Sequence, residues 1–273
     1  MSDLSDTKSM AVFCDFENIA LGVKDANYAK FDIQLVLEKL LIKGPIIFKK
    51  AYCDWSRYRD FKPAMHEASF ELVDIPHLRQ SGKNSADIRM VVDALDLCYT
   101  KSHLRTFVIV SGDSDFSPLV SKLRENNKVV IGVGVKNSSS DLLIANCDEF
   151  IYYDDLARAK EDEQKKREKR RAPARKKTTA KQKKADEEDD RSAEGISLVL
   201  NMVEELLAER GGEDKVWGSM VKQTLKRRQP GFSESYYGFK SFNLLLEEAE
   251  RRKLLTLERD EKSGGYVITG VSS

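Results

Sequence analysis

Two aspartates, Asp113 and Asp115, lie in the stretch SGDSDFSP, directly after the apolar run TFVIV. The apolar run is typical of a buried β-strand, so both carboxylates follow a strand end. The first strand-like run, AVFCDF, also carries Asp15 at its end, and Asn18 follows shortly after. Asp87 opens the helical pattern that precedes TFVIV. Parallel strands end at one edge of a sheet, and a helix running back begins there, so we expect the four aspartates to meet.

Four carboxylates in one place repel one another unless a cation lies between them or some are protonated. Oxygen ligands without neighbouring His or Cys suit Mg²⁺ or Mn²⁺. The three histidines show no spacing typical of zinc ligands (His66, His77, His103). A carboxylate-bound Mg²⁺ acts on phosphate esters by activating water and neutralising developing charge. Asp93 lies more than one helical turn beyond Asp87, which leaves its place at the site open.

The elements that must position these residues alternate between strand and helix patterns. Strands are predicted at 11–16, 45–54, 70–75, 106–112, 128–135 and 149–153, and helices at 32–43, 56–69, 85–100, 116–127 and 138–147. Asp32 is a predicted helix N-cap. The alternation predicts an α/β fold with a mainly parallel sheet and helices on both faces. In such sheets, ligands bind beyond the carboxyl ends of the strands, where the aspartates are expected.

The composition of the chain changes abruptly after Leu156. Residues 157–194 contain few apolar side chains and include the basic run KKREKRRAPARKKTTAKQKK, followed directly by ADEEDD. Such a segment cannot bury a core, so we predict a charged linker, helical near its start and disordered after Pro173. A polar tail of residues 1–9 precedes the first domain, which spans residues 10–156.

A second domain is predicted at residues 195–270. Helical patterns cover 195–209, 214–230 and 234–253, the last with Ser233 or Ser235 as its N-cap, and two strands joined by a charged turn follow. Three helices followed by a hairpin are the layout of a winged helix.

The whole-chain composition excludes several classes of protein. The 273 residues carry a formal net charge of only +1, so the chain is not uniformly basic. The four cysteines lie in apolar runs without a C-x-x-C pair, which predicts buried free thiols, a reducing compartment and no structural zinc (Cys14, Cys53, Cys98, Cys147). No apolar run approaches the roughly 18–20 residues of a membrane span. We therefore expect a soluble, cytoplasmic protein.

Four blocks of the first domain resemble, in order and spacing, those of NYN domains, which are PIN-like metal-dependent ribonucleases. The blocks are VFCDFENIA, KNSADIRMVVDAL, VSGDSDFSPLV and CDEFIYYDDL, and the resemblance covers roughly residues 10–156. It implies a PIN-like fold and a Mg²⁺ or Mn²⁺ site formed by Asp15, Asp87, Asp113 and Asp115. It also implies that Asn18 orients ligand or substrate. Lys83 and Lys136 lie in loops beside this site and are candidate phosphate contacts.

The C-terminal block resembles the OST-HTH, or LOTUS, domain through Pro230-Gly231-Phe232, Tyr237-Gly238-Phe239 and the helix FNLLLEEA. The resemblance implies RNA binding, with a protein partner as the alternative. Candidate phosphate contacts are Lys222, Lys226, Arg227, Arg228 and Lys240, and Tyr236 and Tyr237 are candidates for stacking on bases. Trp217 is expected to pack in the core. The basic run of the linker would attract RNA without reading its sequence, or would serve only as a solvated tether.

These patterns predict an endoribonuclease whose C-terminal domain binds or selects RNA. One alternative is a non-catalytic RNA-binding adaptor with a vestigial acidic site, and another is a 5′-nuclease or phosphatase acting on DNA or nucleotides. Other Asp-rich α/β folds match less well. A haloacid dehalogenase phosphatase needs D-x-D where this chain has Asp15-Phe16-Glu17, and a receiver domain needs a phosphoacceptor Asp and Lys arrangement that we do not find. A Rossmann dehydrogenase needs G-x-G-x-x-G after the first strand.

Overall fold

The computed structural model describes residues 9–76, 85–161, 182–209, 216–260 and 265–271. The chain divides into two compact units, Met1–Gln164 and Lys165–Ser273. Each unit has a hydrophobic core of its own, and each is described by itself.

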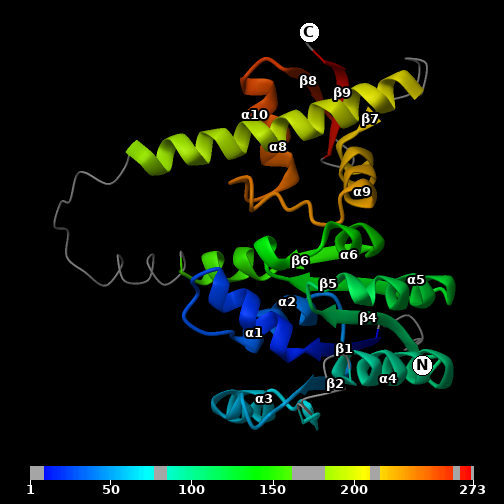
Figure 1. Ribbon diagram of the computed structural model, residues 1–273. Coiled ribbons are helices and arrows are strands. Elements are labelled where there is room, and N and C mark those ends of the chain that lie inside the picture. The colour runs from blue at the N-terminus through cyan, green and yellow to red at the C-terminus, as the bar shows by residue number, and fades with distance from the viewer. Residues whose placement is uncertain (1–8, 77–84, 162–181, 210–215, 261–264, 272–273) are drawn as a thin grey trace, which may run out of the picture. The chain divides into compact units, whose positions relative to one another are not determined.

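The N-terminal unit is built on a six-stranded sheet, seen in Figure 1. Its strands are β1 (Ser9–Asp15), β2 (Ile46–Cys53), β3 (Glu71–Asp74), β4 (Leu104–Val110), β5 (Val129–Gly134) and β6 (Glu149–Tyr152). They lie in the order β3-β2-β1-β4-β5-β6, and every neighbouring pair is parallel. The predicted α/β fold with a mainly parallel sheet is confirmed.

Helices cover both faces of this sheet. The helices α1 (Phe16–Asp25), α2 (Ile33–Leu41) and α3 (Lys62–Glu67) contribute to one core. The helices α4 (Ser85–Thr100), α5 (Ser117–Glu125) and α6 (Asp141–Asn146) contribute to the other. Strand β1 supplies Val12 and Cys14 to the first core and Ala11 and Phe13 to the second. Because β1 is buried on both faces, its sequence is a continuous apolar run, and this run identified the strand in the sequence.

Two helical regions differ from the sequence prediction. Helix α1 was not predicted, because it follows β1 without a loop and contains Gly22, which weakens a helical pattern. The predicted helix at 56–69 is instead a 3₁₀ turn, Arg59–Phe61, followed by α3, which has Pro63 in its first turn. Asp32 is confirmed as a cap, because its Oδ1 accepts a hydrogen bond of 3.1 Å from the N–H of Gln34.

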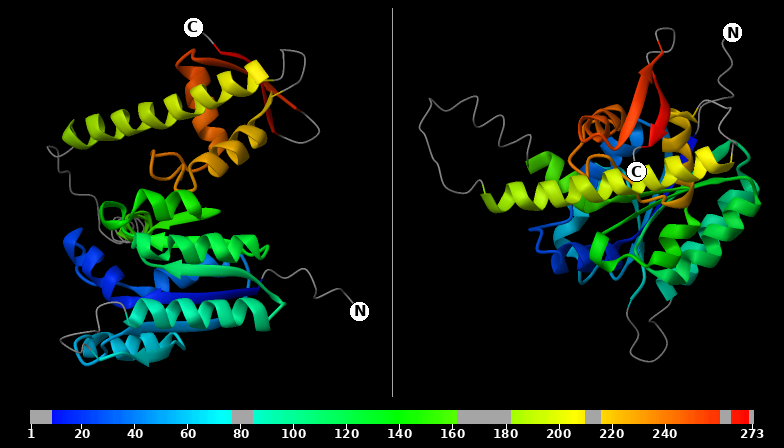
Figure 2. Two further views of the ribbon diagram at one scale, coloured as in Figure 1. Left: turned by 45° about the vertical axis from the view of Figure 1, so that its right-hand side comes forward. Right: turned by 90° about the horizontal axis from the view of Figure 1, so that it is seen from above.

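The C-terminal unit combines helices with a small antiparallel sheet. It contains α8 (Gln182–Glu209), β7 (Val216–Trp217), α9 (Gly218–Arg228), α10 (Phe242–Arg251), β8 (Leu255–Arg259) and β9 (Tyr266–Val271). The strand order is β7-β9-β8, and α8 runs as one long helix in Figures 1 and 2. The core draws on α8, α9 and α10 through residues such as Val199, Val221 and Leu245. The predicted helices followed by two antiparallel strands are present, with β7 as an additional short strand between α8 and α9.

The boundaries inside this unit differ from those expected. Helix α8 begins at Gln182, before Gly195, because the Lys-, Ala- and Glu-rich residues ahead of the amphipathic stretch also favour helix. Residues 216–217 form β7 rather than the start of a helix. The cap of α10 is Ser241, whose side chain accepts a hydrogen bond from the N–H of Leu244, and not Ser233 or Ser235. Gly238, with φ of 88°, turns the chain before this helix.

The predicted buried free thiols are confirmed, because all four cysteines are free and buried (Cys14, Cys53, Cys98, Cys147). No helix within the described ranges is both long and apolar enough to cross a lipid bilayer.

Candidate active site

Asp15 is the last residue of β1 and the N-cap of α1. Its Oδ2 accepts a hydrogen bond of 3.0 Å from the hydroxyl of Ser111, and its Oδ1 accepts one of 3.4 Å from the N–H of Asn18. The side chain is buried, and both bonds stabilise its charged form. The direct step from strand to helix thus holds a carboxylate at the carboxyl edge of the sheet.

The loop after β4 is bound to the first turn of α1 through a polar contact. The N–H of Gly112 donates a hydrogen bond of 2.8 Å to Oδ1 of Asn18, and the N–H of Asp113 donates one of 3.1 Å to Oγ of Ser111. Asp113 then caps the 3₁₀ turn Ser114–Phe116, since its Oδ1 accepts a hydrogen bond of 3.0 Å from the N–H of Asp115. The side chain of Asn18 therefore fixes Gly112, one residue before Asp113. Its predicted role in orienting ligand or substrate stays a prediction.

Gly112 is required at this point because another loop passes against it. A Cβ atom there would lie 2.4 Å from the carbonyl oxygen of Ser138 and 2.9 Å from Cα of Ser139. The carbonyl oxygen of Gly112 accepts a hydrogen bond of 2.9 Å from the N–H of Ser140. The loop after β5 therefore supports the loop that carries Asp113.

The pKa values of two aspartates show that the carboxylates influence one another. The pKa of Asp15 is raised to about 7. Burial is the largest cause, and the negative charges of Asp87 and Asp113 add to it. Hydrogen bonds from Ser111 and Asn18 oppose part of this shift. The pKa of Asp87 is also raised, first by burial and then by Asp113 and Asp115. All four predicted aspartates therefore contribute to one electrostatic group at the carboxyl edge.

This group has the donor chemistry of a Mg²⁺ or Mn²⁺ site, because it offers carboxylate oxygens without nitrogen or sulfur. Within the described ranges, no three His, Cys, Asp or Glu side chains are grouped as a ready metal site. Unscreened carboxylates repel one another, so a closer grouping requires a cation between them. The carboxylate oxygens fit a divalent cation in their donor chemistry, although the described side chains do not form a ready site.

Sequence reasoning missed three residues at this edge. Ser111 orients Asp15, and its signal was a hydroxyl residue directly after the strand that leads to Asp113. Glu17, in the first turn of α1, contributes to the raised pKa of Asp87. Nη1 of Arg57, in the loop after β2, donates a hydrogen bond of 3.0 Å to Oε1 of Glu17. No local pattern signals this pair, because its members lie far apart in the sequence.

Asp93 belongs to a different network. Its Oδ2 accepts hydrogen bonds from Lys50 Nζ at 3.1 Å and from the Tyr52 hydroxyl at 2.9 Å, and its Oδ1 accepts one from Arg89 Nε at 3.1 Å. These contacts lower the pKa of Asp93 despite its partial burial. The question that the sequence left open is settled in favour of a structural ion pair.

Of the two lysines predicted beside the site, the structure describes only Lys136. Lys83 lies outside the described residues. Lys136 follows β5 at the same edge of the sheet, where its backbone N–H donates a hydrogen bond of 2.8 Å to Oδ2 of Asp154. Burial raises the pKa of Asp155, near the end of β6, and the charge of Lys136 opposes part of this shift.

A shallow pocket of about 640 Å³ lies beside Asp115 at the start of α5. Its lining is rich in hydroxyl groups and includes Ser114, Ser117, Ser121 and the largely exposed Leu142. The pocket therefore combines hydroxyl groups and apolar surface directly next to one of the predicted site carboxylates.

The predicted RNA contacts of the C-terminal unit are partly engaged with acidic residues. Lys222 forms an ion pair of 2.7 Å with Glu234, and Arg228 pairs with Glu205. Lys226, Arg227 and Arg228 form the last turn of α9, a position that favours positive charge in any helix. Arg227 and Lys240 are exposed. The basic residues are therefore present on the surface, but two of them would exchange a carboxylate for a phosphate on binding RNA.

The two tyrosines differ in exposure. Tyr237 is 9% exposed and stacks on Phe232 in the core, whereas Tyr236 is only partly buried. Tyr236 is thus the tyrosine of this pair that can stack on a base.

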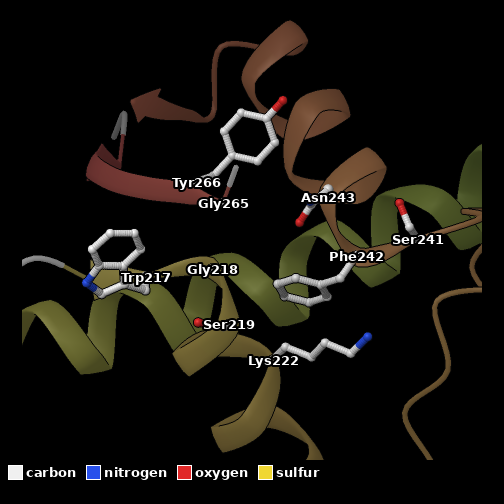
Figure 3. Close-up of a pocket in the computed structure, with 9 residues that line it drawn as sticks. All are labelled: Trp217, Gly218, Ser219, Lys222, Ser241, Phe242, Asn243, Gly265 and Tyr266. Atoms are coloured by element: carbon white, nitrogen blue, oxygen red, sulfur yellow. The ribbon is translucent and has the colours of Figure 1, made fainter. Parts of the chain in front are cut away.

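Lys222 also lines a pocket of about 460 Å³, shown in Figure 3. The indole of Trp217, the ring of Tyr266 and the polar residues Ser219, Ser241 and Asn243 contribute to its lining. Trp217 was expected to pack in the core, and the structure places it at the edge of this pocket with part of its surface exposed.

Comparisons with known proteins agree with the fold of the N-terminal unit. Residues 9–154 match the NYN domain. A crystal structure of a protein of unknown function from Vibrio parahaemolyticus is 26% identical, with a TM-score of 0.50 over 57% of this chain and 98% of the other. No curated protein matches the chain. Because the matched region makes up more than half of the sequence, the chain belongs to the NYN domain family.

Proposed function

We propose that this protein is a Mg²⁺- or Mn²⁺-dependent endoribonuclease that hydrolyses RNA phosphodiester bonds. The observation that carries the proposal is the buried Asp15 carboxylate, whose pKa is raised to about 7 next to Asp87 and Asp113 at the ligand-binding edge of the sheet. Keeping several carboxylates together is costly for a folded protein, and a divalent cation offsets that cost. The NYN family match supports a PIN-like nuclease.

Asp15, Asp87 and Asp113 would hold the cation, and Asp115 would bind it through water or help to position the nucleophile. When bound, such an ion lowers the pKa of water and neutralises the charge that develops on the phosphate and the leaving oxygen. Hydrolysis would proceed by in-line attack of water on phosphorus, with the 3′-oxygen as leaving group.

Residues of the chain itself would hold this arrangement in place. Ser111 fixes the rotamer of Asp15 by its hydrogen bond to Oδ2, which leaves Oδ1 directed along the start of α1. Asn18 fixes the backbone of Gly112 and therefore the start of the turn that carries Asp113 and Asp115. Preorganised ligands of this kind reduce the rearrangement needed on binding.

The C-terminal unit would bind or select RNA, in the manner of an OST-HTH or LOTUS domain, or would bind a protein partner. The support is chemical: α9 ends in Lys226, Arg227 and Arg228, and Tyr236 offers a partly exposed ring nearby in the sequence. Residues 165–181 of the basic run lie outside the described residues, and its last three residues begin α8. The free buried thiols fit a reducing, cytoplasmic compartment.

Cleavage of labelled RNA with and without Mn²⁺ tests the proposal. The parent should cut RNA only with the metal, and Asp15→Asn and Asp113→Asn should each lower the rate by orders of magnitude while RNA affinity in EDTA changes little. Asp96→Asn, an exposed carboxylate two turns from Asp87 on α4, is the matched control. Cleavage that persists in EDTA would overturn the proposal. RNA binding without any cleavage would favour the adaptor, and parallel DNA and nucleotide substrates test the phosphatase or 5′-nuclease alternative.

A further inference from the structure

Arg57 places a guanidinium group beside the acidic edge of the sheet. Its Nη1 lies 3.0 Å from Oε1 of Glu17, and Glu17 comes two residues after Asp15. The two side chains are 53% and 28% exposed, so the pair lies at the surface of the site. Exposed ion pairs add little to stability, so a contribution to folding does not explain the position of the Arg57 guanidinium.

The loop that carries Arg57 is rigidly anchored. Phe16, the first residue of α1, has ring contacts with Trp55, Tyr58 and Phe61, with centroid distances of 4.9, 5.5 and 5.0 Å. The N–H of Trp55 donates a hydrogen bond of 2.9 Å to Asp74, and the N–H of Arg57 donates one of 3.1 Å to the carbonyl oxygen of Asp54. The backbone of Arg57 is therefore fixed relative to Asp15, while its side chain stays accessible.

We propose that Arg57 binds a phosphate of the RNA next to the one that is cut, and that Glu17 holds the guanidinium in position until RNA replaces it. The inference rests on the proposed nuclease function. Strand β2 lies directly beside β1, so the loop after β2 lies about one strand spacing, ~5 Å, from the end of β1. A guanidinium binds phosphate through paired N–H donors, and the bond to Glu17 already shows that this side chain reaches an oxyanion at the edge.

Lys136 is a weaker candidate for the same role. Its charge acts on Asp155 near the end of β6, two strands beyond β4. Arg57 is next to β1, where Asp15 lies. A phosphate adjoining the reacting one is therefore closer to Arg57 than to Lys136.

Two substitutions in the full chain separate a phosphate contact from a structural ion pair. In EDTA, Arg57→Gln should weaken binding of a short single-stranded RNA about tenfold. It should also reduce the slope of log K against log salt by about 0.7, the value for one phosphate contact. Glu17→Gln should tighten binding, because the competing carboxylate is gone. Arg57→Lys should keep the salt slope and lose part of the affinity, since lysine keeps the positive charge but lacks the paired N–H donors of the guanidinium.

Arg124→Gln is the matched control, because Arg124 is similarly exposed and pairs with Asp148 at the opposite edge of the sheet. It should leave RNA binding unchanged. If Arg57→Gln and Glu17→Gln change affinity in the same direction, or if Arg57→Gln changes nothing, Arg57 does not bind the substrate. Melting temperatures in EDTA identify any variant that fails to fold.

Replacing single RNA phosphates by uncharged methylphosphonates locates the contact. One replacement should weaken RNA binding by the parent and have no further effect on binding by Arg57→Gln. Replacing a phosphate that other residues contact would weaken binding by both proteins equally. Equal losses at every position would overturn the inference. Failure of the nuclease function appears separately, as an absence of Mn²⁺-dependent cleavage by a parent whose RNA binding still depends on Arg57.

Discussion

The hydroxyl of Ser111 joins the ends of two neighbouring strands by donating a 3.0 Å hydrogen bond to Oδ2 of Asp15. Oγ of Ser111 in turn accepts a hydrogen bond of 3.1 Å from the N–H of Asp113. Ser111 is completely buried, so neither partner can exchange it for water. One small side chain thus sets the position of two carboxylates that the sequence had associated only through the edge of a sheet.

Ser111→Ala should therefore change both the pKa of Asp15 and the stability of the protein, because the lost hydroxyl makes two buried hydrogen bonds. The hydrogen bond lowers the pKa of Asp15, so its removal should raise that pKa further above about 7. Leaving the Asp113 N–H unpaired should cost about 1–3 kcal/mol of stability in EDTA. Urea unfolding and an NMR titration of the Asp15 carboxyl carbon measure the two effects. Ser121→Ala, which removes a longer 3.3 Å contact to Asn146, is the control. An unchanged Asp15 pKa in Ser111→Ala would contradict this account.

Asp15 should also make the metal-free protein less stable at higher pH. Its folded pKa of about 7 exceeds the ordinary value of 3.8, so the folded state binds the proton more tightly than the unfolded state. The stability from this group is fully present below about pH 4, declines as the pH rises toward 7, and is absent above it. Melting curves in EDTA across this range measure the decline.

Asp15→Asn removes the titrating group and keeps an oxygen that can cap α1. Its stability should therefore depend less on pH than that of the parent, and it should exceed the parent above pH 7 in EDTA. Asp96→Asn should keep the pH dependence of the parent. The Asp15 explanation is wrong if Asp15→Asn and the parent lose stability in parallel between pH 4 and 7.

Gly112→Ala should displace the loop that carries Asp113. The new Cβ would lie 2.4 Å from the carbonyl oxygen of Ser138, a backbone atom that cannot move aside without shifting its loop. We expect a lower melting temperature and a smaller Mn²⁺-induced rise in it. Gly270→Ala in β9 is the matched control, because nothing lies within 4 Å of its added Cβ and its φ is not positive. Equal effects of the two substitutions would show that the close approach at Gly112 is unimportant.

The placement of the four aspartates at one edge of the sheet could be predicted because it depends on short-range signals and on one rule of topology. The apolar runs before Asp15 and Asp113 each mark a strand, and the helix between β3 and β4 returns the chain with Asp87 at its start. Parallel order then brings the three segments to one edge. No long-range contact had to be known.

The contacts that orient these carboxylates could not be predicted in the same way. The bond between Ser111 and Asp15 depends on the register of β1 and β4, in which Cys14 faces Val110, and a sequence pattern does not contain that register. The pair of Arg57 and Glu17 joins two loops from different parts of the chain.

The same limit applies to boundaries in the C-terminal unit. Ser233, Ser235 and Ser241 all have the chemistry of an N-cap, and only the backbone turn at Gly238 decides that α10 begins after Ser241. Strand β7 has two residues, too few for any alternating pattern, and it is defined by its pairing with β9.

Mn²⁺ should raise the melting temperature of the parent, because a ligand that binds only the folded state stabilises it. At a hundred times the dissociation constant the gain is about 2.7 kcal/mol, enough for a shift of several degrees. Asp113→Asn should remove most of this shift and, in EDTA, should be as stable as the parent or more so, since one repelling charge is gone. Asp96→Asn should shift like the parent. An equal shift in Asp113→Asn would place the metal elsewhere.

The two units should divide catalysis and RNA binding between them. The N-terminal unit ends at Gln164, and residues 153–161 are helical, with Leu156 and Ala157 packed on its core, so a truncation should follow Gln164 rather than Leu156. The truncated chain should keep Mn²⁺-dependent cleavage and bind RNA more weakly.

Deletions within the full chain distinguish charge from shape. Removing only the part of the basic run that precedes α8, KKREKRRAPARKKTTAK, should weaken binding equally for all RNAs and flatten its salt dependence, because fewer counterions are released. Removing residues 195–270 should instead reduce preference among RNAs, since stacking and surface shape discriminate between sequences and charge does not. Titrations of several labelled RNAs across a salt series measure both effects. The chain without residues 195–270 could bind every RNA as the parent does at every salt concentration. In that case the C-terminal unit does not read RNA, and its partly exposed surface around Tyr236 is better explained by a protein partner.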